Sequence, residues 1–279
     1  MSGAAAPLVA ALSIRDACVL GAVQGLTEFL PVSSDGHLAV FQHFLTPTLP
    51  AEQKLAVTVA LHFGTLAALL VYFRKDLIEM ARELLDWRRE GYLRGWALLI
   101  AAGTIPAAVI GLTLKSWVEA ALDSLFVVGV CFLFTGTLLW LAARLRNVHR
   151  AEGDIGLADA LVIGTFQALA LLPGVSRSGT TISSGIFRRI RPDVATRFSF
   201  FLGIPAIGGA LVLEGKDVAA LAPELRLPLA IGVLVAYLTG LAAIALLLRV
   251  VRTGKLQYFA YYCWVVGVLV AAAGLMGAA

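Results

Sequence analysis

The chain has 279 residues, of which 59% are hydrophobic and 14% charged, and its net charge is +4. Soluble domains carry roughly a quarter charged residues, so one water-soluble core could not hide this apolar surface. The composition therefore excludes an ordinary soluble domain and predicts an all-α polytopic membrane protein, one membrane domain over residues 1–279. The basic residues lie in short loops between apolar runs, which does not suggest a nucleic-acid partner. The three cysteines lack the CxxC spacing of a metal or redox site.

Six apolar stretches approach the length of about 20 residues that a helix needs to cross a bilayer. They cover residues 55–73, 96–114, 125–143, 198–213, 229–248 and 258–276. Two further apolar regions, 17–45 and 158–187, are interrupted by PVSSDGH (31–37) and PGVSRSGTT (173–181). Non-helical backbone at membrane depth is tolerated only inside protein or beside a water-filled cavity. Both regions are therefore predicted to be re-entrant helix–loop–helix hairpins.

The basic residues favour one orientation of these segments. If the six stretches cross alternately, sixteen Lys and Arg residues fall in loops on one side and five on the other. Cytoplasmic loops carry the excess of Lys and Arg, so the larger set is predicted to be cytoplasmic. Lys115 and Lys216 are then expected outside the cell and Arg88 inside. The first hairpin enters from outside, and the second enters from the cytoplasm.

The two interrupted regions also resemble each other. Residues 16–37 and 159–180 align without gaps, and the identical pairs are Asp16/Asp159, Ala17/Ala160, Val19/Val162, Gly21/Gly164, Gln24/Gln167, Leu26/Leu169, Val32/Val175, Ser33/Ser176 and Gly36/Gly179. We interpret the chain as two homologous halves, 13–145 and 156–279, each a hairpin followed by three spans. Because three is odd, the halves have opposite topology, an inverted repeat with its site near the midplane. Chance resemblance between segments rich in small residues is the alternative.

The differences between the aligned regions are more informative than the matches. Three polar residues of the first region change character in the second: Glu28 aligns with Leu171, Ser34 with Arg177, and His37 with Thr180. One hairpin thus holds a carboxylate, a hydroxyl and an imidazole, and the other holds a guanidinium among hydroxyls. This pattern indicates that one hairpin does chemistry and the other holds an anion.

The sequence SRSGTT predicts the anion site. Arg177 is costly in hydrocarbon without an anionic partner, and a guanidinium can bind two phosphate oxygens at once. The supporting candidates are four hydroxyls and a glycine that lets the backbone approach: Ser176, Ser178, Gly179, Thr180 and Thr181. They open the second helix of the hairpin, where free N–H groups favour anions. The alternative is that Arg177 pairs with backbone carbonyls or with Glu28.

The first hairpin supplies the groups for chemistry. Glu28 lies four residues after Gln24, so a helix places both on one face. The broken loop then adds Ser33, Ser34 and His37, and these groups near one phosphate suit nucleophilic or general acid–base phosphoryl transfer. Glu28 could orient His37, bind a divalent cation or act as the base, and the sequence does not choose among these. A structural hydrogen bond that caps the broken helix is the alternative.

Other ionisable residues receive structural interpretations. His62 lies inside a predicted span and is interpreted as a packed polar residue, and Asp35 as a cap of the following helix. No cluster resembles a metal cage built by the protein alone. A magnesium or calcium ion would need the substrate's phosphates as ligands, with Glu28 as its protein ligand. The apolar setting suggests a lipid substrate whose diphosphate enters the cavity.

QGLTEFLPVSSDGH (24–37) and LLPGVSRSGTTIS (171–183) resemble the two signature regions of the undecaprenyl-diphosphate phosphatase family of the bacitracin-resistance type. The similarity continues in GTIPAAVIGL (103–112) and RFSFFLGIPAI (197–207). The resemblance implies an inverted repeat with six spans and two re-entrant hairpins. It also implies hydrolysis of undecaprenyl diphosphate to the monophosphate carrier and inorganic phosphate, which feeds peptidoglycan synthesis. A bacterial inner-membrane location, a divalent cation (Mg²⁺ or Ca²⁺) and a site open to the periplasm follow from the same resemblance.

On the matched positions, the resemblance implies a catalytic set of Glu28, Ser34, His37 and Arg177, with phosphate ligands at Ser33, Ser176, Ser178 and Thr181. Gln24 stands where family members often have a second glutamate. A neutral amide is neither a strong cation ligand nor a base, which weakens any mechanism that needs two carboxylates. The nucleophile is Ser34, His37 or water. Ser34 is preferred because a loop hydroxyl one step from the repeat position of Arg177 suits in-line attack.

The main alternative is a transporter or flippase of a phosphorylated polyprenyl lipid, because broken helices in inverted repeats are common in secondary transporters. Binding alone does not explain Glu28 beside Ser34 and His37, so an enzyme is favoured, and hydrolysis and lipid movement are not exclusive. A structural membrane protein gives no reason for Glu28 and Arg177 at hairpin tips. A homodimer is compatible with a small membrane enzyme, although no residue argues for it.

Overall fold

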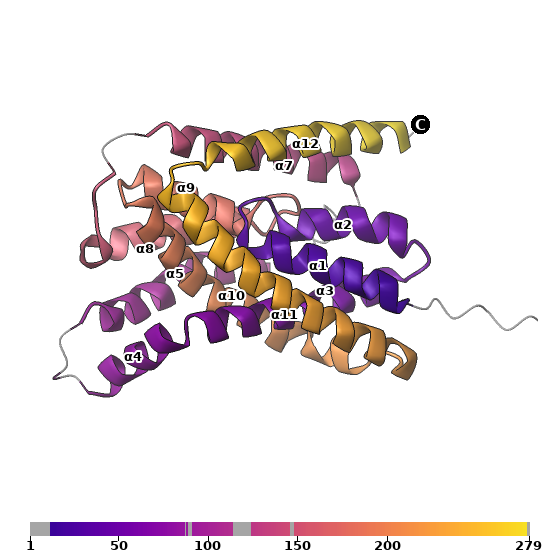
Figure 1. Cartoon of the computed structure of the whole chain (residues 1–279), viewed down its shortest axis with the longest axis horizontal. Helices are drawn as coiled ribbons and strands as arrows, with labels where there is room; N and C mark the ends of the chain where they lie inside the picture. Colours follow the sequence, from indigo (N-terminus) through magenta and orange to yellow (C-terminus); the bar gives the residue numbers. More distant parts are fainter. Residues whose placement is uncertain (1–11, 87, 89–90, 114–123, 146–147, 278–279) are drawn as a thin grey trace, which may run out of the picture.

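The computed structural model describes residues 12–86, 88, 91–113, 124–145 and 148–277, which form helices joined by turns and loops, without a β-strand (Figure 1). One 3₁₀ turn, Glu152–Asp154, and one isolated bridge between Arg150 and Ile190 complete the described secondary structure. The α-helices are α1 (Ile14–Phe29), α2 (Ser34–Leu45), α3 (Ala51–Tyr72), α4 (Arg74–Leu85), α5 (Leu93–Thr113), α7 (Leu125–Ala143), α8 (Leu157–Leu169), α9 (Arg177–Phe187), α10 (Pro192–Ala219), α11 (Pro223–Arg252) and α12 (Gln257–Gly277).

Six of these helices are long and apolar enough to cross a bilayer: α3, α5, α7, α10, α11 and α12. They coincide with the six predicted spans, and α7 has the predicted bounds. The prediction of an all-α multi-pass membrane protein is confirmed. Helices α10 and α11 extend beyond the apolar stretches at both ends, because polar residues continue a helix outside hydrocarbon without cost. The predicted end at Leu114 and the topology marker Lys115 lie outside the described residues.

Both interrupted regions form helix–break–helix hairpins. Helices α1 and α2 are separated by residues 30–33, and α8 and α9 by residues 170–176. Ser33 caps α2 with a positive φ of 69°, and Gly174 in the second break has a φ of 92°. A Cβ on Gly174 would lie 2.4 Å from the carbonyl oxygen of Val128, so this turn requires glycine. The hairpins enter from opposite ends of the long axis, and their breaks meet in the middle (Figure 1).

Each hairpin packs against a helix from the other half of the chain. Helix α1 packs on α11 and α8 packs on α5, while α3 contacts α10 and α7 contacts α12. Glycines permit the closest approaches: a Cβ on Gly21 would lie 2.2 Å from the oxygen of Gly232, and one on Gly164 would lie 2.0 Å from that of Gly103. A two-fold relation between the halves would produce these equivalent pairs. The inverted repeat itself stays a prediction.

The segment after α3 is not the loop that the sequence analysis expected. It forms the amphipathic helix α4, which buries Met80 against α5 and α10 and exposes Leu85. The many charged residues of α4 make its hydropathy too low for a membrane span, although its apolar residues recur with helical spacing. This helix positions the loops at one end of the bundle.

Three of the basic loops meet at that end. Arg197 Nη2 donates to Asp76 Oδ1 at 2.9 Å and Nη1 to Glu152 Oε1 at 3.4 Å. Arg150 Nη2 donates to Asp159 Oδ2 at 2.6 Å, a bond that raises the pKa of the Arg150 guanidinium. Alternating spans require these loops to share one end. The side of the membrane that this end faces stays a prediction.

Candidate active site

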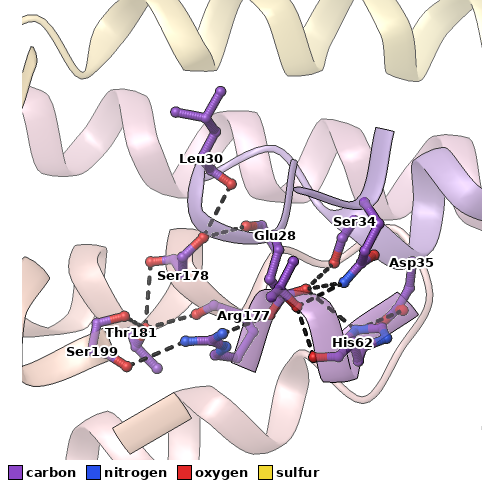
Figure 2. Close-up of polar contacts among 12 residues, drawn as sticks. Glu28, Leu30, Ser34, Asp35, His62, Arg177, Ser178, Thr181 and Ser199 are labelled. Carbon is purple, nitrogen blue, oxygen red and sulfur yellow. Dashed lines mark hydrogen bonds and ion pairs between the residues drawn. The ribbon is translucent and has the colours of Figure 1, made fainter. Parts of the chain in front are cut away.

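Glu28, near the end of α1, lies at the centre of a polar cluster between the two hairpin tips (Figure 2). The residue is 6% exposed. Its Oε1 accepts a hydrogen bond from Arg177 Nη2 at 2.7 Å, and its Oε2 accepts from Ser34 Oγ at 2.6 Å. Gln24 Nε2 donates to the same Oε2 at 3.1 Å. A buried carboxylate requires compensation of this kind, so the cluster holds Glu28 as an ionised group.

Arg177 is the first residue of α9 and connects the second hairpin to α10. Besides Glu28, it bonds through Nη1 to the carbonyl oxygen of Ser199 at 3.3 Å. Gly203 makes room for it, because a Cβ there would lie 2.3 Å from Nη1. The partners considered as the alternative for Arg177, Glu28 and a backbone carbonyl, are therefore the ones found. A guanidinium has five N–H donors and these two bonds use two, so the group can also bind an anion in the adjacent cavity.

His62 belongs to the site, and its interpretation as a packed polar residue was wrong. Its Nε2 lies 3.3 Å from Glu28 Oε2 and 3.7 Å from Asp35 Oδ1 (Figure 2). Its Nδ1 lies 2.9 Å from the oxygen of Thr58. Both ring nitrogens face acceptors, which is the arrangement of an imidazolium. Asp35 likewise lines the cavity, and the side chain that caps α2 is Ser33, which accepts from Gly36 N at 3.3 Å.

His37 does not reach Glu28. Its Nδ1 lies 2.7 Å from the Ser33 oxygen and its Nε2 lies 2.7 Å from the Tyr262 hydroxyl. Because the carbonyl can only accept, Nδ1 donates, and in the neutral ring Nε2 then accepts from Tyr262. His37 lies one turn into α2 on the face toward α7 and α12, where Phe132 meets the ring edge-on at 5.0 Å. The expected Glu28–Ser34–His37 group thus forms only as Glu28–Ser34, with His62 in the place of the imidazole.

The hydroxyls of the second hairpin divide into two groups. Ser176 lines the cavity with Arg177 and caps α9 by accepting from Gly179 N at 3.0 Å. The remaining predicted phosphate ligands are buried behind the loop and bond within the protein: Ser178 Oγ to the Leu30 oxygen at 3.2 Å, Thr180 Oγ1 to the Ser176 oxygen at 3.0 Å, and Thr181 Oγ1 with Ser199 Oγ at 2.6 Å. Gly179 packs against the Ser176 side chain. These four residues hold the loop in shape and do not line the cavity.

A cavity of about 160 Å³ opens beside the cluster. Its polar side comes from both hairpins and α3: Glu28, Ser33, Ser34, Asp35, His62, Ser176 and Arg177. The remaining lining residues come from α5, α8, α10 and the second break: Ala107, Gln167, Ala170, Leu171, Val175, Ala206, Ile207 and Ala210. The lining thus combines a charged and hydroxyl-bearing set with a mostly apolar set, which suits an amphiphilic ligand with an anionic head.

The site does not fit a resident metal ion held by protein alone. Among the described residues, no three His, Cys, Asp or Glu side chains are grouped as metal ligands. Both oxygens of Glu28 already accept hydrogen bonds from Arg177 and Ser34. A divalent cation in this cavity would have to take most of its ligands from a bound anion.

Comparison with known proteins places the chain in a family. The family model described as bacitracin resistance protein BacA matches residues 17–269, a range that contains both hairpins and the whole cluster. The chain is 41% identical to the undecaprenyl-diphosphatase of Alkaliphilus metalliredigens, with 91% of this chain and 96% of that protein covered. It is 42% identical to the undecaprenyl-diphosphatase of Syntrophotalea carbinolica (92% and 97% covered) and 39% identical to that of Desulforapulum autotrophicum (95% and 100%).

The chain belongs to the bacitracin resistance protein (BacA) family. The resemblance drawn from the two signature regions is thereby confirmed. Those regions hold Glu28 and Arg177, which the fold brings to within 2.7 Å of each other although 148 residues lie between them in the chain. The two signature regions therefore meet in the fold, where each contributes one residue to the Glu28–Arg177 ion pair beside the cavity.

Proposed function

We propose that this membrane protein is an undecaprenyl-diphosphate phosphatase. It hydrolyses undecaprenyl diphosphate to undecaprenyl phosphate and inorganic phosphate, and so recycles the lipid carrier for peptidoglycan synthesis. The names of the relatives support the reaction. The observation that carries it is the cluster itself: one carboxylate bonded to a serine hydroxyl and flanked by two cationic side chains, beside a cavity among bilayer helices.

Arg177 and His62 bind the terminal phosphate in this proposal. Both lie within 3.3 Å of Glu28 and both line the cavity, so an arriving phosphate competes with Glu28 for their N–H groups. Their positive charge stabilises the charge on the transferring phosphoryl group, as donors fixed in a water-poor site do most strongly. As the phosphate takes these partners, the Glu28 carboxylate becomes a stronger base.

Ser34 is the preferred nucleophile because its Oγ–H already donates to Glu28 at 2.6 Å. Its oxygen attacks the terminal phosphorus while Glu28 takes its proton. The bond from that phosphorus to the bridging oxygen breaks, and undecaprenyl phosphate leaves with the bridging oxygen. Water then cleaves the phosphoserine to release inorganic phosphate. Direct attack by water, with Glu28 as the base, is the alternative route.

His37 is a positioning residue in this scheme. Its two ring nitrogens bond Ser33 and Tyr262, so it anchors the loop that carries Ser34 to α12. Ser33 adds a hydroxyl to the cavity wall, and Gln24 holds the Glu28 carboxylate from the side. Ser178, Gly179, Thr180 and Thr181 support the loop of Arg177.

We also propose that a divalent cation, Mg²⁺ or Ca²⁺, enters with the diphosphate, with Glu28 as its candidate protein ligand. The lack of a resident cage among the described residues is why the substrate must supply its other ligands. Chelation of divalent ions should therefore weaken substrate binding and leave the unfolding temperature of the substrate-free protein unchanged. A chelator-insensitive reaction would contradict this part.

Location and assembly are separate proposals. We place the protein in the bacterial inner membrane, with the site open to the periplasm and the basic loops in the cytoplasm. Cysteine labelling should find Lys115→Cys and Lys216→Cys accessible from outside and Arg88→Cys from inside. The reverse pattern would contradict the orientation. A homodimer is a further proposal, which molecular mass measurement in detergent tests.

The deciding experiment measures phosphate release from a long-chain prenyl diphosphate by the purified protein in detergent, with magnesium or calcium present. Release by the wild type and its loss in Glu28→Gln would support the phosphatase. Glu28→Gln keeps the shape of the side chain and removes the negative charge. If the wild type binds the lipid and releases no phosphate, the alternative function, a transporter or flippase of a phosphorylated polyprenyl lipid, is favoured, because detergent removes the two sides that transport requires.

A further inference from the structure

Gln167 is a buried amide without a hydrogen-bond partner in the part of the chain that the structure describes. The residue is 3% exposed, and neither Nε2 nor Oε1 finds a partner among those residues. It nevertheless lines the cavity that also contains Glu28 and Arg177. An unpaired buried amide is costly, so a ligand in the cavity is expected to supply its partners.

The comparison with Gln24 explains why Gln167 is unpaired. The two residues align in the repeat, and each lies three residues after the glycine that brings its helix against a partner helix, Gly21 or Gly164. Gln24 Nε2 donates to Glu28, four residues later. The residue four positions after Gln167 is Leu171, whose side chain offers no acceptor. The same helical position therefore bonds a carboxylate in α1, whereas in α8 it lines the cavity without a described partner.

Its place in the cavity indicates what it binds. The groups proposed for the terminal phosphate, Arg177 and His62, belong to the charged part of the lining. Gln167 is the polar residue in the lining from α5, α8, α10 and the start of the second break, where the other residues are alanine, leucine and isoleucine. A prenyl chain packs against apolar residues, so we expect the phosphate that carries it to lie nearer to Gln167 than the terminal phosphate does.

We propose that Gln167 binds the lipid-linked phosphate, the one that remains on the prenyl chain as the leaving group. This inference rests on the proposed phosphatase function. Nε2–H donates to a non-bridging oxygen of that phosphate, and Oε1 accepts from water that enters with the diphosphate. When the bond between the terminal phosphorus and the bridging oxygen breaks, negative charge grows on the leaving phosphate. The hydrogen bond from Gln167 therefore strengthens toward the transition state.

The test compares Gln167→Met and Gln167→Glu with Ser183→Ala. Ser183 Oγ is another buried polar atom without a described partner, and Ser183 does not line the cavity, so its variant controls for removing an unpaired group. The assay measures phosphate release from a prenyl diphosphate, and its inhibition by prenyl monophosphate and by inorganic phosphate. Tm is measured for each variant with no lipid added.

Gln167→Met should lower kcat/KM about tenfold and raise the inhibition constant of prenyl monophosphate about tenfold, which is the loss of about 1.4 kcal/mol. Inhibition by inorganic phosphate should not change, because it binds at Arg177. The Tm should not fall, since methionine removes a buried unpaired amide. Gln167→Glu, with nearly the same shape, should weaken inhibition by prenyl monophosphate further through charge repulsion. Ser183→Ala should match the wild type in every assay.

Two results would overturn the inference while leaving the phosphatase intact. One is a Gln167→Met enzyme whose kcat/KM and inhibition constants stay within twofold of the wild type. The other is an equal weakening of prenyl monophosphate and inorganic phosphate, which indicates a general disturbance of the site. A wild type that releases no phosphate would instead overturn the proposed function, so the two failures are distinguishable.

Discussion

Helices α3 and α10 each supply the site with a backbone carbonyl and, four residues later, a position for a cationic group. Thr58 and Ser199 are the eighth residues of these helices, and His62 and Gly203 are the twelfth. The Thr58 oxygen lies 2.9 Å from His62 Nδ1, and the Ser199 oxygen accepts from Arg177 Nη1 at 3.3 Å. At Gly203 no side chain is present, and the Arg177 guanidinium fills the space. The site thus has two cationic side chains at matching positions along these helices. His62 belongs to the span α3, and Arg177 belongs to the second hairpin.

This comparison teaches that the site is more symmetric in charge than in sequence. His62 approaches Oε2 of Glu28 and Arg177 approaches Oε1, so one carboxylate serves both cations. The two sides still differ in packing. Gly64 lets α11 approach α3, because its Cβ would lie 2.4 Å from the Val233 oxygen. Its counterpart, the fourteenth residue of α10, is Pro205, which borders a second cavity of about 280 Å³ between α4, α5 and α10.

Replacement of Arg177, the cationic residue of the second hairpin, should have the largest effect on turnover. Arg177→Ala should lower kcat by about 10³, the upper range for loss of one fixed donor to a transition-state anion. Glu28 keeps His62 and Ser34 as partners, so circular dichroism and detergent gel filtration should still show a folded protein. Arg191→Ala, which breaks only an exposed ion pair with Asp193, is the matched control and should keep full activity. Near-normal turnover of Arg177→Ala would contradict its role at the phosphate.

Replacement of His62, the cationic residue of the span α3, should have the next largest effect on turnover. His62→Ala should lower kcat by about 10², because it removes a charged neighbour of Glu28 and a phosphate contact. His37→Ala should have a smaller effect, since His37 bonds Ser33 and Tyr262 and does not line the cavity. Both are measured by phosphate release under saturating lipid. A larger loss in His37→Ala than in His62→Ala would show that the ranking of the two histidines is wrong.

The smallest effect on kcat/KM should come from filling the space beside Gly203 that the Arg177 guanidinium occupies. Gly203→Ala places a methyl group 2.3 Å from Nη1, and an overpacking cost of about 1.4 kcal/mol, near the low end of the usual range, corresponds to about tenfold lower kcat/KM. Gly208→Ala on the same helix meets nothing within 4 Å and should leave kcat/KM unchanged. Equal activity of the two variants would mean that the guanidinium does not need this position during turnover.

Hydropathy predicted the membrane spans well because bilayer thickness and backbone hydrogen bonding leave few alternatives. Leu125–Ala143 is the clearest case, with bounds that agree at both ends. The breaks at residues 30–33 and 170–176 followed from Pro, Gly and Ser in apolar runs. Helix α4 was missed because a helix that lies against its neighbours needs only one apolar face, and its charges hide that face from a search for spans.

The site was predicted less completely, since side-chain neighbours depend on how helices rotate against one another. Glu28, Ser34 and Arg177 were identified because they interrupt apolar sequence at the breaks. His62 carries the same signal, an ionisable residue inside a span, and the rule applied to Arg177 would have identified it. The direction of His37 depends on Tyr262, which is 225 residues away in the sequence. Gln167 could be singled out from the sequence only by comparison with Gln24, because Glu28 follows Gln24 by four residues and Leu171 follows Gln167 by four.

The exchange of hairpins between the halves has a consequence for biosynthesis. Helix α1 packs on α11, with Gly21 against Gly232, so the segment that carries Glu28 enters the membrane long before its partner has been translated. Until then, Gln24 and Glu28 have neither Arg177 nor α11 beside them, and two polar groups in a short helix are poorly retained in hydrocarbon. We expect the first hairpin to remain at the membrane surface or beside the insertion machinery while the rest of the chain is made. We therefore expect the first hairpin to insert stably only after α9 and α11 have been translated.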